Sequence, residues 1–133
     1  MKKALFLTLI FVFSSFGANV KNIYKSLKLW NPLSVKIKNG NLIIVTQERV
    51  VTDTIFLSIV RVGLCTDYYF DKSFLNGIDK IYVLNKYSYR GYVLDGGGDI
   101  CEKISNMKDD LKIKTFILSN THLFSRYIDP LKF

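Results

Sequence analysis

The sequence predicts an α+β fold, a single small domain in which an antiparallel sheet of about five strands carries helices packed on one face. Three observations point to this fold. Apolar residues recur at helical spacing in some segments, they alternate at strand spacing in others, and an Asn-Gly pair joins two of the strand segments. The expected order of elements along the chain is α-β-β-α-β-β-α-β.

The first helix is expected between residues 20 and 30. Its apolar residues follow three- and four-residue spacing, and three lysines fall on the opposite side. The helix should end before Pro32, because the residue that precedes a proline avoids helical backbone angles. The apolar face consists of Val20, Ile23, Leu27 and Trp30.

A hairpin is expected next, with its turn at Asn39-Gly40. Asn-Gly is typical of a two-residue hairpin turn, because both central residues must adopt positive φ angles. This turn places the apolar side chains of the two strands on one face of the sheet. The predicted cross-strand pairs are Ile37 with Leu42 and Val35 with Ile44.

A central helix is expected to begin after Thr52, whose hydroxyl can cap it, with Asp53 as a favourable charge in the first turn. Apolar residues between 55 and 63 cover most of its circumference, which is typical of a buried helix. We expect it to end near Cys65, with residues 68–70 in a loop.

The second half of the chain predicts a second hairpin, a short helix and a last strand. Residues 85–88 would connect the two hairpin strands, and Asp99 would cap the helix. The expected ranges are 78–84 and 89–94 for the hairpin strands, 100–106 for the helix and 111–118 for the last strand.

The N-terminus has the three parts of a secretory signal peptide. Lys2 and Lys3 precede an apolar stretch over 4–12, and small residues follow up to Gly17. The apolar stretch is shorter than the roughly 20 residues that a transmembrane helix needs. We therefore expect a signal peptide over 1–17 and a single α+β domain over 18–133, without a stable membrane anchor and located in the periplasm or secreted.

The chain is basic, with a formal net charge of +8. Loss of Lys2 and Lys3 with the signal peptide would subtract 2 and leave +6. The sequence contains no recognisable DNA- or RNA-binding module, and export removes most such targets. The charge therefore predicts no nucleic-acid partner, and it is compatible with an acidic protein partner.

Cys65 and Cys101 are the two cysteines of the chain. An oxidising compartment makes a disulfide between them the expected state, and closing a loop of that length would stabilise the fold by roughly 4 kcal/mol in the chain-entropy model. The alternative is a reactive thiol at a helix N-terminus, where the thiolate would be stabilised.

No residue pattern predicts catalysis, a metal or a cofactor. His122 is the only histidine, so a site with several histidines is impossible. Ser105 and Lys108 fit a Ser-x-x-Lys spacing, but its companion motifs are missing. Several aspartates could supply a pair of carboxylates, and nothing in their spacing selects one pair. We therefore do not expect an enzyme.

Two features predict protein binding. Glycines in the Asp95–Asp99 loop free the backbone to approach a partner, although a strained turn that leads to Cys101 is the favoured explanation of them. Tyrosine and arginine dominate the energetics of protein interfaces, and several lie near the second hairpin. The candidate partner-binding residues are Tyr68, Tyr69, Tyr87, Tyr89, Arg90, Gly96, Gly97 and Gly98.

The function expected from these features is that of an exported small binding protein without catalytic activity. We expect a periplasmic inhibitor or immunity protein that blocks a toxin or hydrolase acting in the cell envelope. The first alternative is a non-catalytic accessory subunit of an envelope secretion or conjugation assembly. The second alternative is a small hydrolase that depends on carboxylates.

Overall fold

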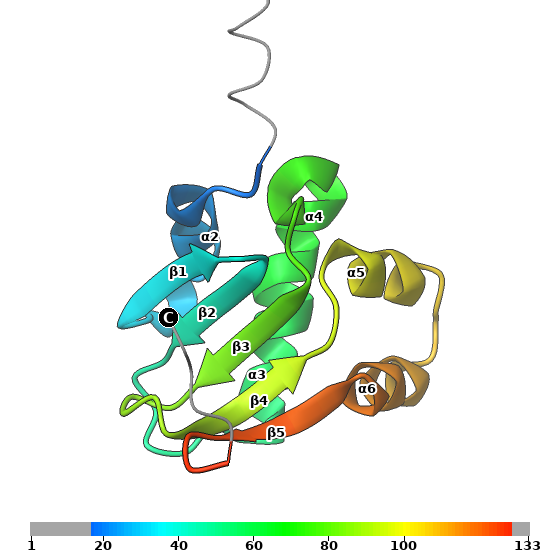
Figure 1. Cartoon of the computed structure of the whole chain (residues 1–133). Helices are drawn as coiled ribbons and strands as arrows, with labels where there is room; N and C mark the ends of the chain where they lie inside the picture. The colour runs from blue at the N-terminus through cyan, green and yellow to red at the C-terminus, as the bar shows by residue number, and fades with distance from the viewer. Residues whose placement is uncertain (1–16, 129–133) are drawn as a thin grey trace, which may run out of the picture.

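A computed structural model describes residues 17–128 and confirms the α+β class (Figure 1). Five strands form one sheet in the order β1-β2-β3-β4-β5. Helices α3 and α4 lie behind the sheet in this view, and α5 and α6 lie beside its β4–β5 end. Residues 1–16 of the expected signal peptide lie outside the described residues. Within residues 17–128, every helix is too short or too polar to cross a bilayer.

The first helix is split into an α-helix, α2 (Val20–Ser26), and a 3-10 turn over Lys28–Trp30. The Asn19 side chain caps α2 by accepting hydrogen bonds from the N–H groups of Lys21 and Asn22. Ile23 and Leu27 are fully buried, as the apolar spacing predicts, whereas Val20 of the same predicted face is 39% exposed.

The first hairpin has the predicted turn and the predicted register. Strands β1 (Ser34–Lys38) and β2 (Asn41–Val45) pair antiparallel. Asn39 and Gly40 both adopt positive φ angles, 52° and 79°. The cross-strand pairs are Ile37 with Leu42 and Val35 with Ile44, as expected.

One strand pair differs from the all-antiparallel sheet that the sequence predicts. Strand β3 (Lys80–Leu84) pairs with β2 in parallel, with Ile44 opposite Val83. The cause is the connection between them, which crosses the helical face and returns the chain to the end of the sheet where β2 began. Strand β4 (Arg90–Leu94) then pairs antiparallel with β3, which completes the second hairpin.

The central helix is longer than predicted. It runs without a break through α3 (Asp53–Ser58), the π-helical segment Ile59–Cys65 and α4 (Thr66–Phe70), and Thr52 caps it by accepting from the Ile55 N–H. The predicted end at Cys65 and the predicted loop over 68–70 are therefore wrong. No proline or glycine interrupts this stretch after Gly63, and its extra turn buries Tyr68 against the core.

The predicted last strand over 111–118 is also wrong. Residues Asp110–Ser119 form helix α6, which Asp109 caps by accepting from the Leu111 N–H. The alternation of lysines with apolar residues fits a strand, but Ile113 and Ile117 also follow the four-residue spacing that packs one helical face against the core. The last strand comes later, as β5 (Thr121–Ser125), and pairs antiparallel with β4.

Helix α5 (Gly98–Ser105) is the predicted short helix, with a different start. Gly97 occupies the cap position, and Asp99 lies in the first turn. The Asp99 carboxylate accepts from the Gly97 N–H across 2.8 Å, so it closes the loop locally instead of capping the helix from outside.

The main core lies between the sheet and the helices. Phe56 of α3 stacks on Tyr92 of β4 with ring centroids 4.9 Å apart, and the core extends to Ile104 and Ile117 of α5 and α6. A second apolar cluster lies on the opposite face of the sheet, where Tyr82 packs edge-on against Phe124. Its buried members are Ile43, Leu84, Val93 and Phe124.

Candidate functional site

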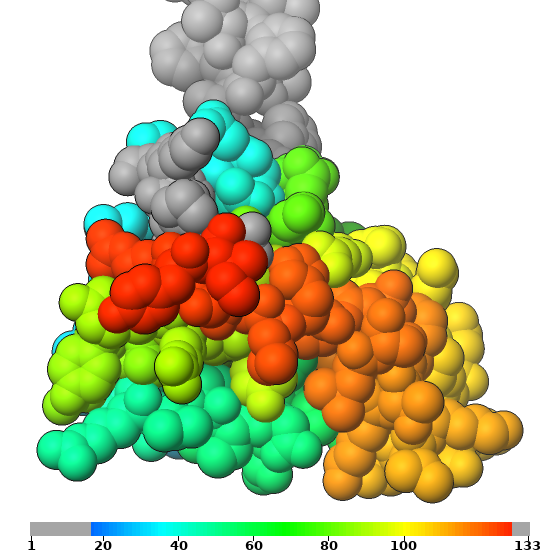
Figure 2. Space-filling view, turned by 60° about the horizontal axis from the view of Figure 1, so that its bottom comes forward, coloured from blue at the N-terminus to red at the C-terminus, as the bar shows by residue number. Residues whose placement is uncertain are grey.

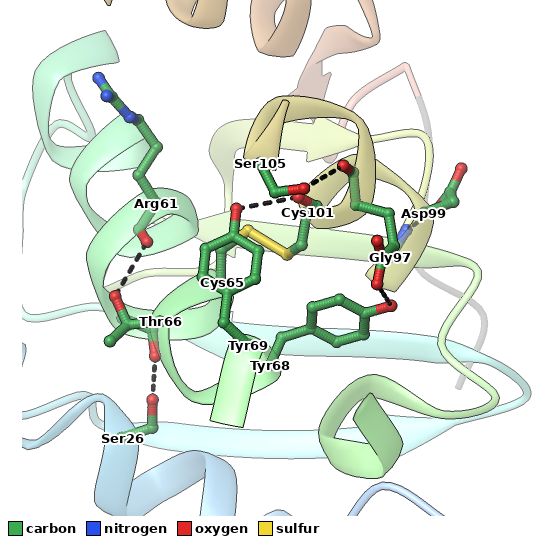
Figure 3. Close-up of a disulfide and its surroundings, with 12 residues drawn as sticks. Ser26, Arg61, Cys65, Thr66, Tyr68, Tyr69, Gly97, Asp99, Cys101 and Ser105 are labelled. Carbon is green, nitrogen blue, oxygen red and sulfur yellow. Dashed lines mark hydrogen bonds between the residues drawn. A yellow bond between two sulfur atoms is a disulfide. The ribbon is translucent and has the colours of Figure 1, made fainter. Parts of the chain in front are cut away.

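The structure brings the two cysteines together at the distance of a disulfide. The Sγ atoms of Cys65 and Cys101 are 2.10 Å apart, and both residues are buried (Figure 3). The bond joins the interior of the central helix to α5, because the helix continues beyond Cys65. The disulfide therefore holds the central helix and α5 together at the edge of the core.

Tyr68 and Tyr69, two of the predicted binding residues, form hydrogen bonds within the protein beside this disulfide. The Tyr68 hydroxyl donates to Glu102 Oε1 across 3.0 Å, and the Tyr69 hydroxyl donates to the Cys101 carbonyl across 2.9 Å (Figure 3). Burial is the main cause that raises the pKa of both phenols. Tyr68 is only 8% exposed, so it holds the central helix against α5 and offers little surface to a partner.

The predicted glycine loop is packed against the protein as well. Gly96 and Gly97 are buried, and a Cβ atom at Gly97 would overlap the carbonyl oxygen of Ile78. A Cβ atom at Gly98 would lie 2.7 Å from the Tyr68 ring. These glycines allow two backbone segments and a ring to approach closely, and they form no exposed binding loop.

The second hairpin presents its tyrosines to solvent. Tyr87 and Tyr89 are 49% and 44% exposed, and their ring centroids lie 6.2 Å apart. Tyr127 extends the row, with its ring 6.4 Å from that of Tyr89 and 83% of the side chain exposed. Tyr127 is not among the residues predicted from the sequence, because it belongs to the turn after β5 and not to the hairpin.

Two cations lie over this row of rings. Lys86 Nζ lies 5.2 Å from the Tyr87 ring centroid, and the Arg126 guanidinium lies 5.5 Å from that of Tyr89. Such cation–π contacts orient the side chains and leave the positive charge available to a partner. We call Tyr87, Tyr89, Tyr127, Lys86 and Arg126 the basic tyrosine surface.

Asn85 positions the hairpin. Its side-chain oxygen accepts from the N–H groups of Tyr89 and Arg90, and its side-chain amide donates to the Arg49 carbonyl. The Lys86 N–H donates to the Glu48 carbonyl across 2.8 Å, which adds a backbone tie to the same loop. The hairpin and the 46–50 loop are therefore held as one unit.

A groove of about 530 Å³ opens between this loop and the β4–β5 end of the sheet. Figure 2 looks onto this end, with β5 and its following turn in red above the blue-green segment that contains the loop. Apolar side chains of Val50, Leu123 and Ile128 line the groove beside Arg49 and Arg90. We call it the arginine groove.

The cations of this end have no acidic partner within residues 17–128. Arg49, Lys86, Arg90 and Arg126 are all exposed, and none forms a salt bridge in the part of the chain that the structure describes. Glu48 is the only acid of the adjoining loop. This end of the domain therefore carries an excess of positive charge beside exposed aromatic rings.

A second, larger groove of about 720 Å³ lies between the central helix and α6. An ion pair closes part of its rim, since Arg61 lies 2.8 Å from Asp110. The Arg61 hydrogen bond, assisted by Lys114, lowers the pKa of Asp110. Because these charges already satisfy one another, the rim offers fewer free groups to a partner than the arginine groove does.

The described residues assemble no metal site, since no three potential ligands among them cluster together. His122 Nδ1 lies 2.8 Å from Asp95 Oδ2, with Lys80 on the other carboxylate oxygen at 3.6 Å. This pair is exposed, and the aspartates and glutamates within 17–128 are exposed or half-buried. No buried pair of carboxylates is formed there.

Comparison of the chain with known proteins finds no match. No protein-family model, no curated protein and no solved structure is similar to it.

Proposed function

We propose that this protein is an exported binding protein that inhibits a toxin or hydrolase in the cell envelope, as a periplasmic inhibitor or immunity protein does. The observation that carries the proposal is the basic tyrosine surface, in which three exposed rings lie at one end of the sheet with two cations that form no salt bridge within residues 17–128. Tyrosine and arginine supply most of the binding energy in protein interfaces.

The shape of this end supports inhibition. The hairpin between β3 and β4 projects from the sheet, and buried Asn85 fixes it to the neighbouring loop. A fixed projection loses little conformational entropy when it enters a partner's cleft. Hydrolases that cleave glycosidic bonds use paired carboxylates, so their clefts are acidic and attract a basic projection.

The test is a pull-down from the envelope fraction of the source organism, with the chain that lacks residues 1–17 as bait. The proposal expects a specific protein that is retained at moderate salt and lost with the Tyr87→Ala/Tyr89→Ala variant. The matched control is Tyr24→Ala, since Tyr24 is 42% exposed but lies on α2. Failure to recover any partner, or equal recovery with all three baits, contradicts the proposal.

Inhibition is then measured directly on the recovered partner. The purified partner should lose its hydrolytic or toxic activity when the protein is added at one equivalent. The same amount of the Tyr87→Ala/Tyr89→Ala variant should leave that activity unchanged. A partner that binds tightly and keeps full activity would favour an accessory subunit of an envelope assembly instead.

A further inference from the structure

Within residues 17–128, β5 is an edge strand, and the backbone groups on its outer side pair with no other strand. The Arg126 N–H donates to the Tyr89 carbonyl, and the Asp95 N–H donates to the Asn120 carbonyl, so even-numbered residues of β5 face β4. In an antiparallel pair the alternate residues then point their N–H and C=O groups away, and of these the Ser125 carbonyl already accepts from the Ile128 N–H. Leu123 is at the centre of this free edge, and no hydrogen bond within residues 17–128 engages its backbone.

An open edge of this kind is a template for another strand, and soluble proteins commonly protect it with charge, proline or a covering element. Strand β5 contains neither lysine nor proline, and Leu123 presents an apolar side chain that is 72% exposed. The opposite edge strand, β1, carries Lys36 and Lys38. The two edges of the sheet therefore differ in protection.

The arginine groove lies on the same strand. Leu123, Phe124 and Ser125 of β5 form one wall, and Val50 faces them from the loop. Arg49 and Arg90 line this groove without a salt bridge to any described acid. A guanidinium binds a carboxylate with two parallel hydrogen bonds, so two free arginines favour an acidic side chain as their ligand.

We propose that β5 binds an extended, acidic segment of a partner protein by strand addition, with the partner's backbone on the Leu123 edge and its carboxylate on Arg49 and Arg90. Strand addition supplies affinity through main-chain hydrogen bonds and specificity through side-chain pockets. An apolar side chain of the partner, next to its acidic residue, packs against the apolar wall of the groove. This inference rests on the proposed function, because it names the segment of the partner that is recognised.

The first experiment identifies the ligand class without knowledge of the partner. Random linear heptapeptides displayed on phage are selected on the immobilised chain that lacks residues 1–17. The inference expects enrichment of peptides that place an Asp or Glu next to Val, Ile or Leu. Absence of enrichment, or enrichment of basic sequences, overturns it.

The second experiment locates the site with a selected peptide and fluorescence anisotropy. Leu123→Pro removes the outward N–H without removing a bond to β4, so binding should weaken about tenfold or more, whereas Leu123→Ala retains the backbone donor and should weaken it less. Arg49→Gln/Arg90→Gln should weaken binding by a similar factor, and the control Lys36→Gln/Lys38→Gln on the other edge should not. A thermal melt checks that each variant is folded. Equal affinity of Leu123→Pro and the unchanged chain overturns strand addition.

A second copy of the chain could occupy the β5 edge instead of a partner. Analytical ultracentrifugation tests whether the chain forms such a dimer. The inference expects a monomer for the unchanged chain, and a dimer that Leu123→Pro dissociates overturns it. The tests are separable from those of the proposed function. If the strand-addition tests fail but Tyr87→Ala/Tyr89→Ala still abolishes recovery of the partner, the inhibitor proposal stands. If no envelope partner is recovered, the inhibitor proposal fails even when selected peptides bind to β5.

Discussion

The side-chain amide of Asn85 donates a hydrogen bond to the main-chain carbonyl of Arg49 across 3.1 Å. The two residues are separated by most of the β2-to-β3 crossover, which includes the central helix, and by β3. The bond thus joins the loop that leaves β2 to the hairpin that leaves β3, and it places Arg49 beside Arg90 in one groove. The geometry of the proposed binding end depends on this buried amide, which is only 6% exposed.

Replacing Asn85 should therefore damage both stability and binding. Asn85→Ala removes three hydrogen bonds to partly buried backbone groups, which costs about 1–3 kcal/mol of unfolding free energy. Urea denaturation measures this loss, with Asn106→Ala at the exposed C-terminal end of α5 as the control. If Asn85→Ala and Asn106→Ala unfold at the same urea concentration, Asn85 does not organise the hairpin.

Reduction of the disulfide should destabilise the fold without rearranging the sheet. Cys65 and Cys101 are separated by 36 residues in the sequence. Opening a loop of this length lowers the unfolding free energy by about 4 kcal/mol in the chain-entropy model. The Cys65→Ser/Cys101→Ser variant measured by urea denaturation checks this value, and thiol titration of the unchanged chain in denaturant should detect free thiols only after reduction. Free thiols before reduction would contradict the disulfide.

Glu102 should make the stability depend on pH on the acid side. The hydrogen bonds from Lys72 and Tyr68 lower the pKa of Glu102 below its ordinary value of 4.5. A carboxylate with a lowered pKa in the folded state stabilises the fold above pH 4.5, and this contribution is lost as the pH falls through the lowered pKa. Glu102→Gln should therefore reduce stability at neutral pH and flatten the decline below pH 4.5.

Thermal melts between pH 2 and pH 7 test this prediction. Glu48→Gln is the control, since Glu48 is exposed and forms no salt bridge within residues 17–128. If Glu102→Gln follows the same pH curve as the unchanged chain, the Lys72 and Tyr68 contacts contribute nothing to the folded state.

Substitutions in the glycine loop should have graded effects. Gly97→Ala places a Cβ atom against the Ile78 carbonyl oxygen, so backbone must move, and overpacking of this kind costs typically about 1–3 kcal/mol. Gly98→Ala meets the Tyr68 ring instead, which can rotate, so it should cost less. The unfolding free energies of the two variants give the comparison. Equal losses would show that the Tyr68 ring is held as firmly as the backbone.

Part of the binding end could be predicted from the sequence. Tyr87, Tyr89 and Arg90 lie in or next to a hairpin turn, where side chains are exposed, and the structure places them there. Arg49 and Tyr127 were missed, because they come from other segments and their proximity is created by the Asn85 bond and by the pairing of β5 with β4. Tyr68 and the three glycines are also of residue types that favour binding surfaces. They pack against α5, Ile78 and one another inside the protein instead.

Local sequence accounts for the elements whose causes act within a few residues. The positive φ angles at Asn39 and Gly40 set the hairpin register, and the Thr52 hydroxyl starts the central helix. Long-range packing, in contrast, makes residues 110–119 a helix and makes β2 and β3 run parallel. The local pattern of 110–119 satisfies both strand and helix spacing, so burial of Ile113 and Ile117 against a core built from distant segments selects the helix. Strand direction likewise follows from where the crossover returns the chain, which no short stretch of sequence encodes.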